Sequence, residues 1–304
     1  MKFAFAMPHL VELKETPAWE KAVTGADQTK LAKFAEKLGY DMLSVPEHFV
    51  IPNHHLDLSG AHYFHAAAGQ GYFAGATETI KINSSIAILP LQNPIITAKA
   101  LSTADWLSSG RIITTFGVGW LKEEFDILGV PFSERGKMAD EYLAAMIELW
   151  TKESASFEGK YVSFKDVAFE PKPFQKPHLE IWMGGDADAV LKRTAKYATG
   201  WWPFLTKPAD IANRIDFIKS QPEFRGGDFE VMYGMGTERL GDGHVVLDAP
   251  DAKAGQSKQK IIDRLNWYKE QGVTMTSVPT PPCKSIAECM DYTQWVIEEI
   301  KPAV

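Results

Sequence analysis

Residues 79–120 constrain the fold of this chain more than any other stretch, because they follow the order strand, turn, helix, turn, strand. The first strand carries isoleucines on one face, at Ile80, Ile82, Ile86 and Ile88. Its other face has smaller side chains such as Ser85 and Ala87, which suits a ring of strands that closes over its narrow side. Asn93 is a typical residue to begin the helix, and Gly110 is a typical residue to end it.

The second strand of this stretch ends in two glycines, Gly117 and Gly119, and Trp120 follows them. Glycine has no side chain, so the backbone at this strand end is open to close approach by another molecule. The pattern therefore indicates a place where a flat or phosphorylated ligand could lie against the main chain.

The rest of the chain continues the alternation, and eight strand–helix pairs can be counted over 304 residues. This predicts an α/β fold, a single (β/α)8 TIM barrel in one domain over residues 1–304. Residues 152–178 break the alternation and are expected to form an insertion between helix 4 and strand 5, with a hairpin at FEGKYVSF. Residues 236–255 are rich in Gly, Asp and Pro and are expected to be a mobile loop at the barrel mouth. The other barrel strands are expected at residues 2–7, 40–45, 179–183, 200–202, 229–235 and 273–278.

The composition limits the class of protein. A hydrophobic content of 45% with 23% charged residues is typical of a soluble protein with a large core. The net charge of −7 argues against nucleic-acid and acidic-lipid partners, and no apolar run is long enough to cross a membrane. The amino terminus lacks the pattern of a signal peptide, so a cytoplasmic protein is expected. Cys283 and Cys289 are the only cysteines and are expected to be free thiols.

Three fragments in this order, SSIAILPLQNP, LSSGR and GVGW, resemble the third and fourth strands of the bacterial luciferase-like monooxygenase superfamily. The resemblance extends over nearly the whole chain, and the segments FEGKYVSF and PKPFQKPHLEIWMGG make it closest to the branch that depends on coenzyme F420. It implies a barrel enzyme that uses coenzyme F420, with flavin mononucleotide (FMN) as the alternative cofactor. It also implies a homodimer.

The resemblance assigns a cofactor site to several strand ends. The position of Ser85 and Ile86 is similar to one where the superfamily has a non-prolyl cis peptide that supports the central ring of the cofactor; an ordinary buried serine is the structural alternative. The residues expected to bind the cofactor are Ser85, Ile86, Gly117, Gly119, Gly184, Gly185 and Asp186.

The segment GGDADAVLKR predicts a strand end that leads into a helix, where free amides and the positive helix end can bind a phosphate. A simple tight turn is the alternative. Asp186 and Asp188 stand where many relatives resemble GGS or GGT, and their carboxylates would repel a dianion, although an Asp can also be the helix N-cap. This difference favours the phosphodiester of F420 over the phosphate monoester of FMN. Lys192 and Arg193 are the nearest possible counter-charges, with an exposed helix surface as their other placement.

His48 is the predicted catalytic residue, because it follows a strand end in SVPEHF and an imidazole exchanges protons near neutral pH. In the deazaflavin-dependent sugar-phosphate dehydrogenases of the superfamily, the motif resembles SDHF and its histidine accepts the proton of a substrate hydroxyl. Here Glu47 replaces the aspartate and Pro52 replaces an aromatic residue, which puts the same substrate in doubt. A structural histidine is the alternative interpretation of His48.

The expected substrate-binding residues are His9, Trp120 and Trp202, which lie at or after strand ends. Five of the eight histidines fall between residues 48 and 65, but no HExxH or HxH pattern accompanies them. His54 and His55 are adjacent and would not both face inward from an extended loop, so no metal site is expected.

The combined prediction is an oxidoreductase that transfers a hydride between an F420 or flavin cofactor and a small organic substrate, with His48 taking or giving the proton. The first alternative is an FMN-dependent monooxygenase that uses O2 and receives reduced flavin from a partner reductase. The alternative from another class is a non-catalytic flavin-binding barrel.

Overall fold

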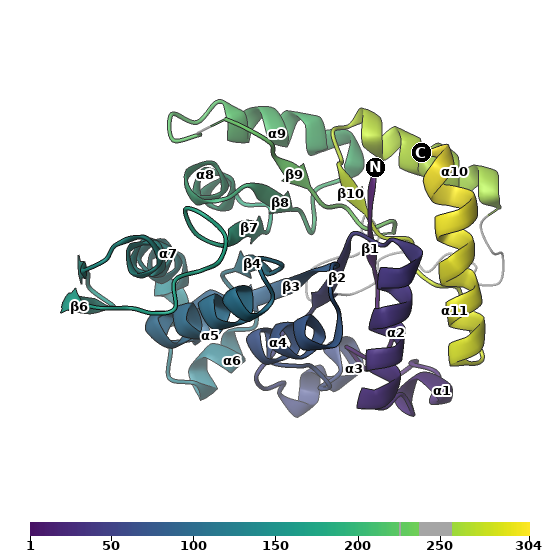
Figure 1. The fold of residues 1–304 in the computed structure, drawn as a ribbon, viewed down its shortest axis with the longest axis horizontal. Helices are drawn as coiled ribbons and strands as arrows, with labels where there is room; N and C mark the ends of the chain where they lie inside the picture. Colours follow the sequence, from purple (N-terminus) through teal and green to yellow (C-terminus); the bar gives the residue numbers. More distant parts are fainter. Residues whose placement is uncertain (225, 237–256) are drawn as a thin grey trace.

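The computed structural model of the chain describes residues 1–224, 226–236 and 257–304. Eight parallel strands form a barrel, in the order β10-β1-β2-β3-β4-β7-β8-β9, with helices around it (Figure 1). The barrel strands are β1 (Lys2–Phe5), β2 (Met42–Val45), β3 (Lys81–Ile88), β4 (Ile113–Gly117), β7 (Glu180–Gly184), β8 (Gly200–Trp202), β9 (Glu230–Val231) and β10 (Met275–Thr276). A parallel bridge between Met232 and Met275 closes the ring. The predicted TIM barrel is confirmed, whereas the predicted mobile loop lies, apart from Gly236, outside the described residues.

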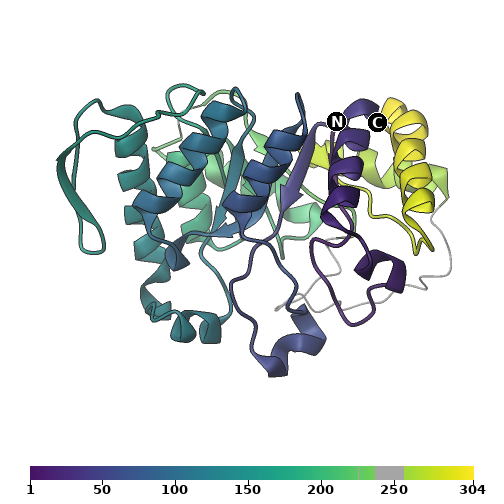
Figure 2. The same ribbon diagram turned by 60° about the horizontal axis from the view of Figure 1, so that its bottom comes forward.

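Long helices cover the outside of the barrel, and short helices lie in the loops that follow the strands. The long helices are α2 (Gly25–Leu38), α4 (Ala66–Ala76), α5 (Pro94–Leu107), α7 (Arg135–Thr151), α8 (Asp188–Tyr197), α9 (Ile211–Lys219), α10 (Lys258–Glu270) and α11 (Ile286–Trp295). The short helices are α1 (Ala18–Lys21), α3 (Leu56–Ser59) and α6 (Lys122–Ile127). Figure 2 shows these three on the side of the barrel opposite the chain termini, where β1, β2 and β4 end. Among the described residues, no helix is long and apolar enough to cross a membrane.

The expected insertion contains an antiparallel hairpin of β5 (Ala155–Glu158) and β6 (Ser163–Val167), which stands apart from the barrel sheet (Figure 1). Phe157 pairs with Phe164 across the two strands. The hairpin turn is fixed from outside, because the Glu141 carboxylate accepts the backbone N–H groups of residues 160–162. Its sequence prediction is confirmed.

Two apolar clusters lie on the two sides of the barrel wall. The inner cluster consists of Ala4, Met42, Ile113, Trp182, Met232 and Met275, which come from six different strand regions. The outer cluster is much larger and packs the strands against the helices, with Ile80 and Ile82 of β3 among its members. Side chains on a strand alternate between two faces, so successive residues of each strand contribute to the two clusters in turn.

The predicted faces of β3 are wrong beyond Ser85. The pairing of β3 with β4 shifts register between Ser85 and Ala87, so the alternation changes phase there. Ala87, expected on the small face, packs in the outer cluster. Ile86, expected on the same side as Ile82, instead points toward Gly117 and Gly184 at the ends of β4 and β7. A regular period of two cannot predict such a shift.

The last two barrel strands are shorter than the sequence predicts. The expected ranges 229–235 and 273–278 correspond to the two-residue strands β9 and β10. Backbone bonds nevertheless continue beyond them, because Tyr233 N donates to Met275 O at 3.0 Å and Met235 N donates to Ser277 O at 2.9 Å. The barrel is therefore closed by a ladder that extends past the regular strand geometry.

Candidate active site

His48 lies just after β2 and is held by a buried carboxylate. Its Nδ1 atom is 2.9 Å from Oε2 of Glu124, whose side chain is 1% exposed. The other oxygen of Glu124 accepts the backbone N–H groups of Phe49 at 2.6 Å and Val50 at 3.3 Å. A carboxylate in this position accepts the Nδ1 hydrogen, fixes the orientation of the ring and makes Nε2 the nitrogen that exchanges a proton.

Sequence reasoning missed Glu124. It lies on α6, where Glu124 and Phe125 are buried while Lys122 and Asp126 are exposed. One buried acid beside an acidic neighbour that is partly exposed, Glu123, leaves no distinctive pattern in the sequence. The only available signal was the pairing of Glu124 with the apolar Phe125 on one face.

Aromatic side chains surround the His48 ring. Tyr63 contacts it edge to face with 4.8 Å between ring centroids, and Trp120 does so at 6.0 Å. The Tyr63 hydroxyl donates to the Ser59 carbonyl at 2.6 Å. Burial raises the pKa of Tyr63 to about 12, and the nearby Glu124 carboxylate adds to this effect. Tyr63 therefore stays neutral. Trp120, which was expected to bind substrate, lies beside the predicted catalytic histidine.

The two other expected substrate-binding residues have partners of their own. The His9 ring bonds to the Val23 carbonyl and to Glu12, and it stacks on His62. Trp202 packs against the inner barrel cluster. The substrate role of both residues stays a prediction.

Glu47 is buried, and both of its carboxylate oxygens bind other segments of the chain rather than facing a substrate. Its Oε1 atom accepts the N–H of Ala66 at 2.8 Å. Its Oε2 atom accepts the N–H of Ile88 at 2.9 Å and the Gln92 side-chain amide at 2.8 Å. Burial raises the pKa of Glu47, while the hydrogen bonds from Ala66 and Ile88 act in the opposite direction. The residue therefore connects the end of β2 to the start of α4 and to the end of β3.

The peptide bond between Ser85 and Ile86 is cis, as the family resemblance implies. The Ile86 side chain fills the space that two glycines leave. A Cβ atom built on Gly117 would lie 1.8 Å from Ile86 Cδ1, and one on Gly184 would lie 2.7 Å from Ile86 Cγ2. These two glycines therefore make room for the Ile86 side chain at the barrel mouth. The sequence indicated open space there for another molecule, but Ile86 occupies it. Gly119 similarly packs against Ile88 and Phe125.

One amide of the glycine pair before α8, expected to bind a phosphate, already has a partner in the protein. Gly184 ends β7, and the N–H of Gly185 is already bonded to the Trp202 carbonyl at 3.1 Å. The N-cap of α8 is Ala187, with no side-chain cap, so the suggestion that Asp186 caps the helix is wrong. The Asp186 carboxylate instead accepts hydrogen bonds from the loop after β8, including the Thr206 N–H at 2.8 Å and hydroxyl at 2.6 Å.

The counter-charge near this helix start is Arg214, which sequence reasoning missed. Its guanidinium bonds to the Asp186 carbonyl at 2.5 Å and to the Asp188 carboxylate at 2.9 Å. Arg193, which was considered as a counter-charge or as an exposed residue, is neither. Its side chain is 3% exposed and binds Asp140 at 2.7 Å. Arg214 comes from α9, so no local spacing could connect it with the glycine pair.

Two groups of side chains among the described residues have the spacing of metal ligands: His9, Glu12 and His62, and His54, His55 and Glu123. The extended loop expected around His54 and His55 is a 3-10 turn (Asn53–His55), and the two side chains do not both face inward, because they are 66% and 19% exposed. Their Nε2 atoms lie 3.6 and 3.8 Å from Oε1 of Glu123.

Comparison with known proteins places these features in a family. The chain is 27% identical over 239 residues to an FMNH2-dependent dimethylsulfone monooxygenase of Pseudomonas putida, covering 74% of this chain and 62% of that protein. It therefore spans less than two thirds of that relative. It is 32% identical over 200 residues to an uncharacterized protein of Mycobacterium tuberculosis, covering 62% of this chain and 70% of that protein.

Solved structures share the fold. An F420-dependent secondary alcohol dehydrogenase, determined with an F420–acetone adduct, aligns with a TM-score of 0.76 and 17% identity over 100% of this chain and 98% of its own. The family model described as luciferase-like monooxygenase matches residues 1–275. The chain belongs to the luciferase-like monooxygenase family.

Proposed function

We propose that this protein is an oxidoreductase that uses a flavin-type cofactor to move a hydride to or from a carbon atom of a small organic substrate. Coenzyme F420 is the preferred candidate for this cofactor. The observation that carries the proposal is the buried pair of His48 and Glu124 at the barrel mouth. Active sites of such barrels lie at the carboxyl ends of the strands, where these residues are located.

The residues at the mouth fit a flat redox cofactor. Ile86, seated on Gly117 and Gly184, offers an apolar surface against which a ring system can pack. The first turn of α8 has no side-chain cap, and Arg214 lies beside it, so a phosphate group would meet free amides and a guanidinium there. When bound, the cofactor supplies the hydride chemistry.

His48 supplies the proton that accompanies the hydride. A substrate hydroxyl that becomes a carbonyl loses a proton as well as a hydride, and the reverse reaction needs both. With Nδ1 held by Glu124, the imidazole can exchange that proton through Nε2. The half-buried Trp120 and the neutral Tyr63 beside the ring limit the access of water to it.

The charges near α8 favour F420, although Asp186 contributes less directly to this preference than the sequence indicates. Asp186 binds the loop after β8, so its carboxylate is not directed at the helix start. The carboxylates of Asp186 and Asp188 together with the Arg214 guanidinium still leave one net negative charge. A singly charged phosphodiester is repelled less by that charge than a doubly charged phosphate monoester.

An FMN-dependent monooxygenase is the second candidate, and the relative from Pseudomonas putida favours it because the printed activity of that relative depends on FMNH2. This reaction would require O2 and a partner reductase.

The two candidates are separated by one set of assays with the purified protein. Oxidised F420 is mixed with a panel of small alcohols, and reduced FMN is mixed with the protein in air, while cofactor absorbance and O2 consumption are recorded. The proposal expects alcohol-dependent reduction of F420 without O2 uptake. Substrate-dependent O2 uptake with FMN would support the monooxygenase, and no turnover with either cofactor would contradict both.

Glu124→Gln tests whether the His48 pair is the catalytic element. The amide oxygen can still accept the backbone N–H groups of Phe49 and Val50. The group that then faces His48 Nδ1 is an uncharged NH2, which cannot accept its hydrogen. We expect kcat to fall by about 100-fold with little change in cofactor affinity. An unchanged kcat would remove the pair from the mechanism.

A further inference from the structure

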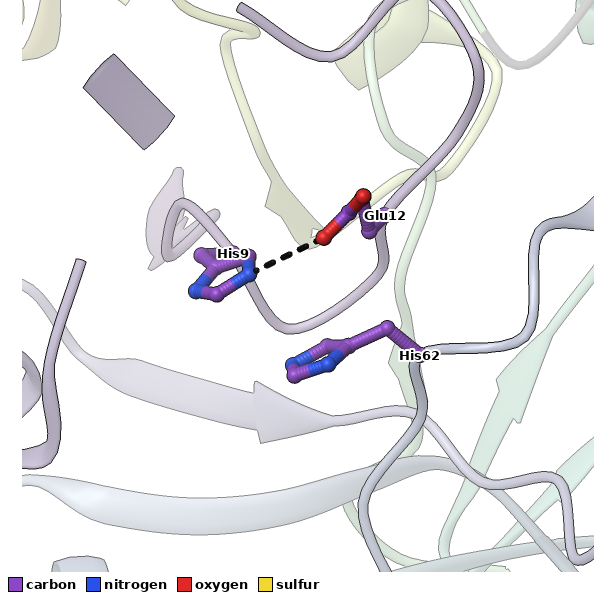
Figure 3. A group of neighbouring side chains, drawn as sticks. All are labelled: His9, Glu12 and His62. Atoms are coloured by element: carbon purple, nitrogen blue, oxygen red, sulfur yellow. Dashed lines mark hydrogen bonds and ion pairs between the residues drawn. The ribbon is translucent and has the colours of Figure 1, made fainter. Parts of the chain in front are cut away.

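His9, Glu12 and His62 form a compact group beside the barrel mouth (Figure 3). His9 and Glu12 follow β1, whereas His62 comes just before α4. An antiparallel backbone bridge between Glu12 and His62 joins the two segments. One possible ligand atom of each side chain lies within 4.8 Å of those of the other two.

The hydrogen bonds of His9 determine which ring nitrogen carries the hydrogen. Nδ1 is 3.1 Å from the Val23 carbonyl oxygen, and a carbonyl can only accept, so Nδ1 is the donor. In the neutral ring, Nε2 then has a lone pair, and it faces Oε2 of Glu12 at 3.4 Å. A lone pair and a carboxylate oxygen repel each other, so this arrangement needs a positive charge, either a second proton on His9 or a cation between the two atoms.

The two oxygens of the Glu12 carboxylate have different neighbours. Oε1 lies 3.1 Å from the Lys21 ammonium group, so Oε2 is the oxygen that faces His9.

His62 provides a second reason to place a cation here. Its Nε2 atom is buried and has no hydrogen-bond partner among the described residues. Most buried polar atoms in proteins have such a partner, and a bound ion is one of the groups that can supply it. The His62 ring stacks on the His9 ring with 4.4 Å between centroids and 9° between planes. Because parallel lone pairs do not meet at one ion, His62 must rotate to coordinate, and its Nε2 atom loses no hydrogen bond when it does so.

We propose that His9, Glu12 and His62 bind a divalent transition-metal ion, for which Zn²⁺ is the best match. Two imidazoles and one carboxylate, with water in the fourth position, are a preferred tetrahedral donor set for zinc. The Val23 carbonyl orients His9 through the opposite ring nitrogen, as commonly found for metal-binding histidines. A cavity of about 630 Å³ between α2 and α4, lined by His9 and His62 among others, gives the ion a path of entry. The site revises the sequence-based expectation that the chain binds no metal.

The test is a titration of the chelator-treated full chain with Zn²⁺ alone, measured by calorimetry and by competition with a chromogenic chelator. We expect one tightly bound equivalent and a higher melting temperature in its presence. Glu12→Gln, which keeps the side-chain size, and His62→Asn, which removes the imidazole, are each expected to weaken binding by about 100-fold. The matched control is the double variant His54→Asn, Glu123→Gln, which removes the other group with ligand spacing and should leave the tight equivalent in place.

Absence of Zn²⁺ binding, or equal affinity in wild type, Glu12→Gln and His62→Asn, would overturn the proposal and leave a doubly protonated His9 as the explanation of the contact with Glu12. Loss of the tight equivalent in the control variant would also overturn it. If both ligand variants fail to fold by circular dichroism, Co²⁺ added to the wild-type protein decides. A four-coordinate absorption spectrum supports the site, and a six-coordinate or absent spectrum contradicts it.

Discussion

At the scale of single residues, His48 depends on a partner far away in the sequence. Glu124 lies 76 positions later and reaches the ring from α6. Because the same carboxylate also binds the backbone after His48, it fixes both the side chain and the loop that carries it. The predicted catalytic residue is therefore oriented before substrate arrives.

His48→Ala is expected to reduce turnover by about 10²- to 10⁴-fold, because it removes the group that exchanges the proton. Cofactor affinity should remain within about threefold of wild type, since the ring surface at Ile86 is unchanged. The measurement is kcat together with a cofactor titration. His54→Ala is the matched control, because its ring is mainly exposed and lies on the surface 3.6 Å from Glu123. Normal turnover of His48→Ala would exclude this histidine from the reaction.

Glu47→Ala is expected to destabilise the protein by about 3 kcal/mol, because three buried donors lose their acceptor. Glu47→Gln should cost less, since it keeps one acceptor oxygen and the side-chain volume, and burial already raises the pKa of the native carboxyl. Urea unfolding of both variants measures the difference. The exposed Glu15→Ala serves as the control and should change the free energy of unfolding by less than about 0.5 kcal/mol. Equal stability of all three variants would contradict the bracing role.

At the scale of secondary-structure elements, the ends of β3, β4 and β7 are fitted to one another through a single side chain. Ile86 occupies the space next to Gly117 and Gly184, so the shape of the barrel mouth depends on this three-way contact. Neighbouring positions in such a contact are expected to show strong coupling of their mutational effects.

Gly117→Ala is expected to destabilise the protein by about 1 to 3 kcal/mol, because its Cβ atom would lie 1.8 Å from Ile86 Cδ1. Ile86→Val removes that Cδ1 atom, and the next nearest atom of Ile86 lies at 3.1 Å. The double variant should therefore recover most of the stability that Gly117→Ala loses. Thermal unfolding of the two single variants and the double variant gives the coupling energy. Gly75→Ala on α4, where a Cβ atom meets nothing within 4 Å, is the control. Additive effects would contradict the contact.

The hairpin of β5 and β6 is expected to loosen in acid through Glu134. The pKa of Glu134 is lowered from 4.5 to about 2, mainly by a hydrogen bond from Lys160 and secondly by one from Tyr161. Because the folded pKa is lower than the unfolded one, the stabilising contribution is complete above pH 4.5 and is lost as the pH falls toward 2. Glu134→Gln should therefore be less stable than wild type at pH 6 and equally stable near pH 2. A stability difference that does not change with pH would contradict this assignment.

At the scale of the whole molecule, the sequence was sufficient to predict the barrel and insufficient to predict the site in full. The alternation of apolar runs and helix signals is local, so the helix after Gly185 and the inserted hairpin could be predicted where the structure has them. Glu124 and Arg214 could not be found, because each acts on a segment that is distant in sequence and only the closed barrel brings them together. The direction of the Ile86 side chain could not be predicted either, since no pattern of residue types signals the register shift between Ser85 and Ala87.

We propose that the carboxyl ends of the barrel strands bind a flavin-type cofactor between Ile86 and the start of α8. The most direct test is a crystal structure of the protein soaked with F420 and, in a parallel crystal, with FMN. We expect electron density for a ring system against Ile86, within reach of His48, and for a phosphate at the first turn of α8 near Arg214. Density for either cofactor only elsewhere, for example in the cavity between α2 and α4, would contradict it.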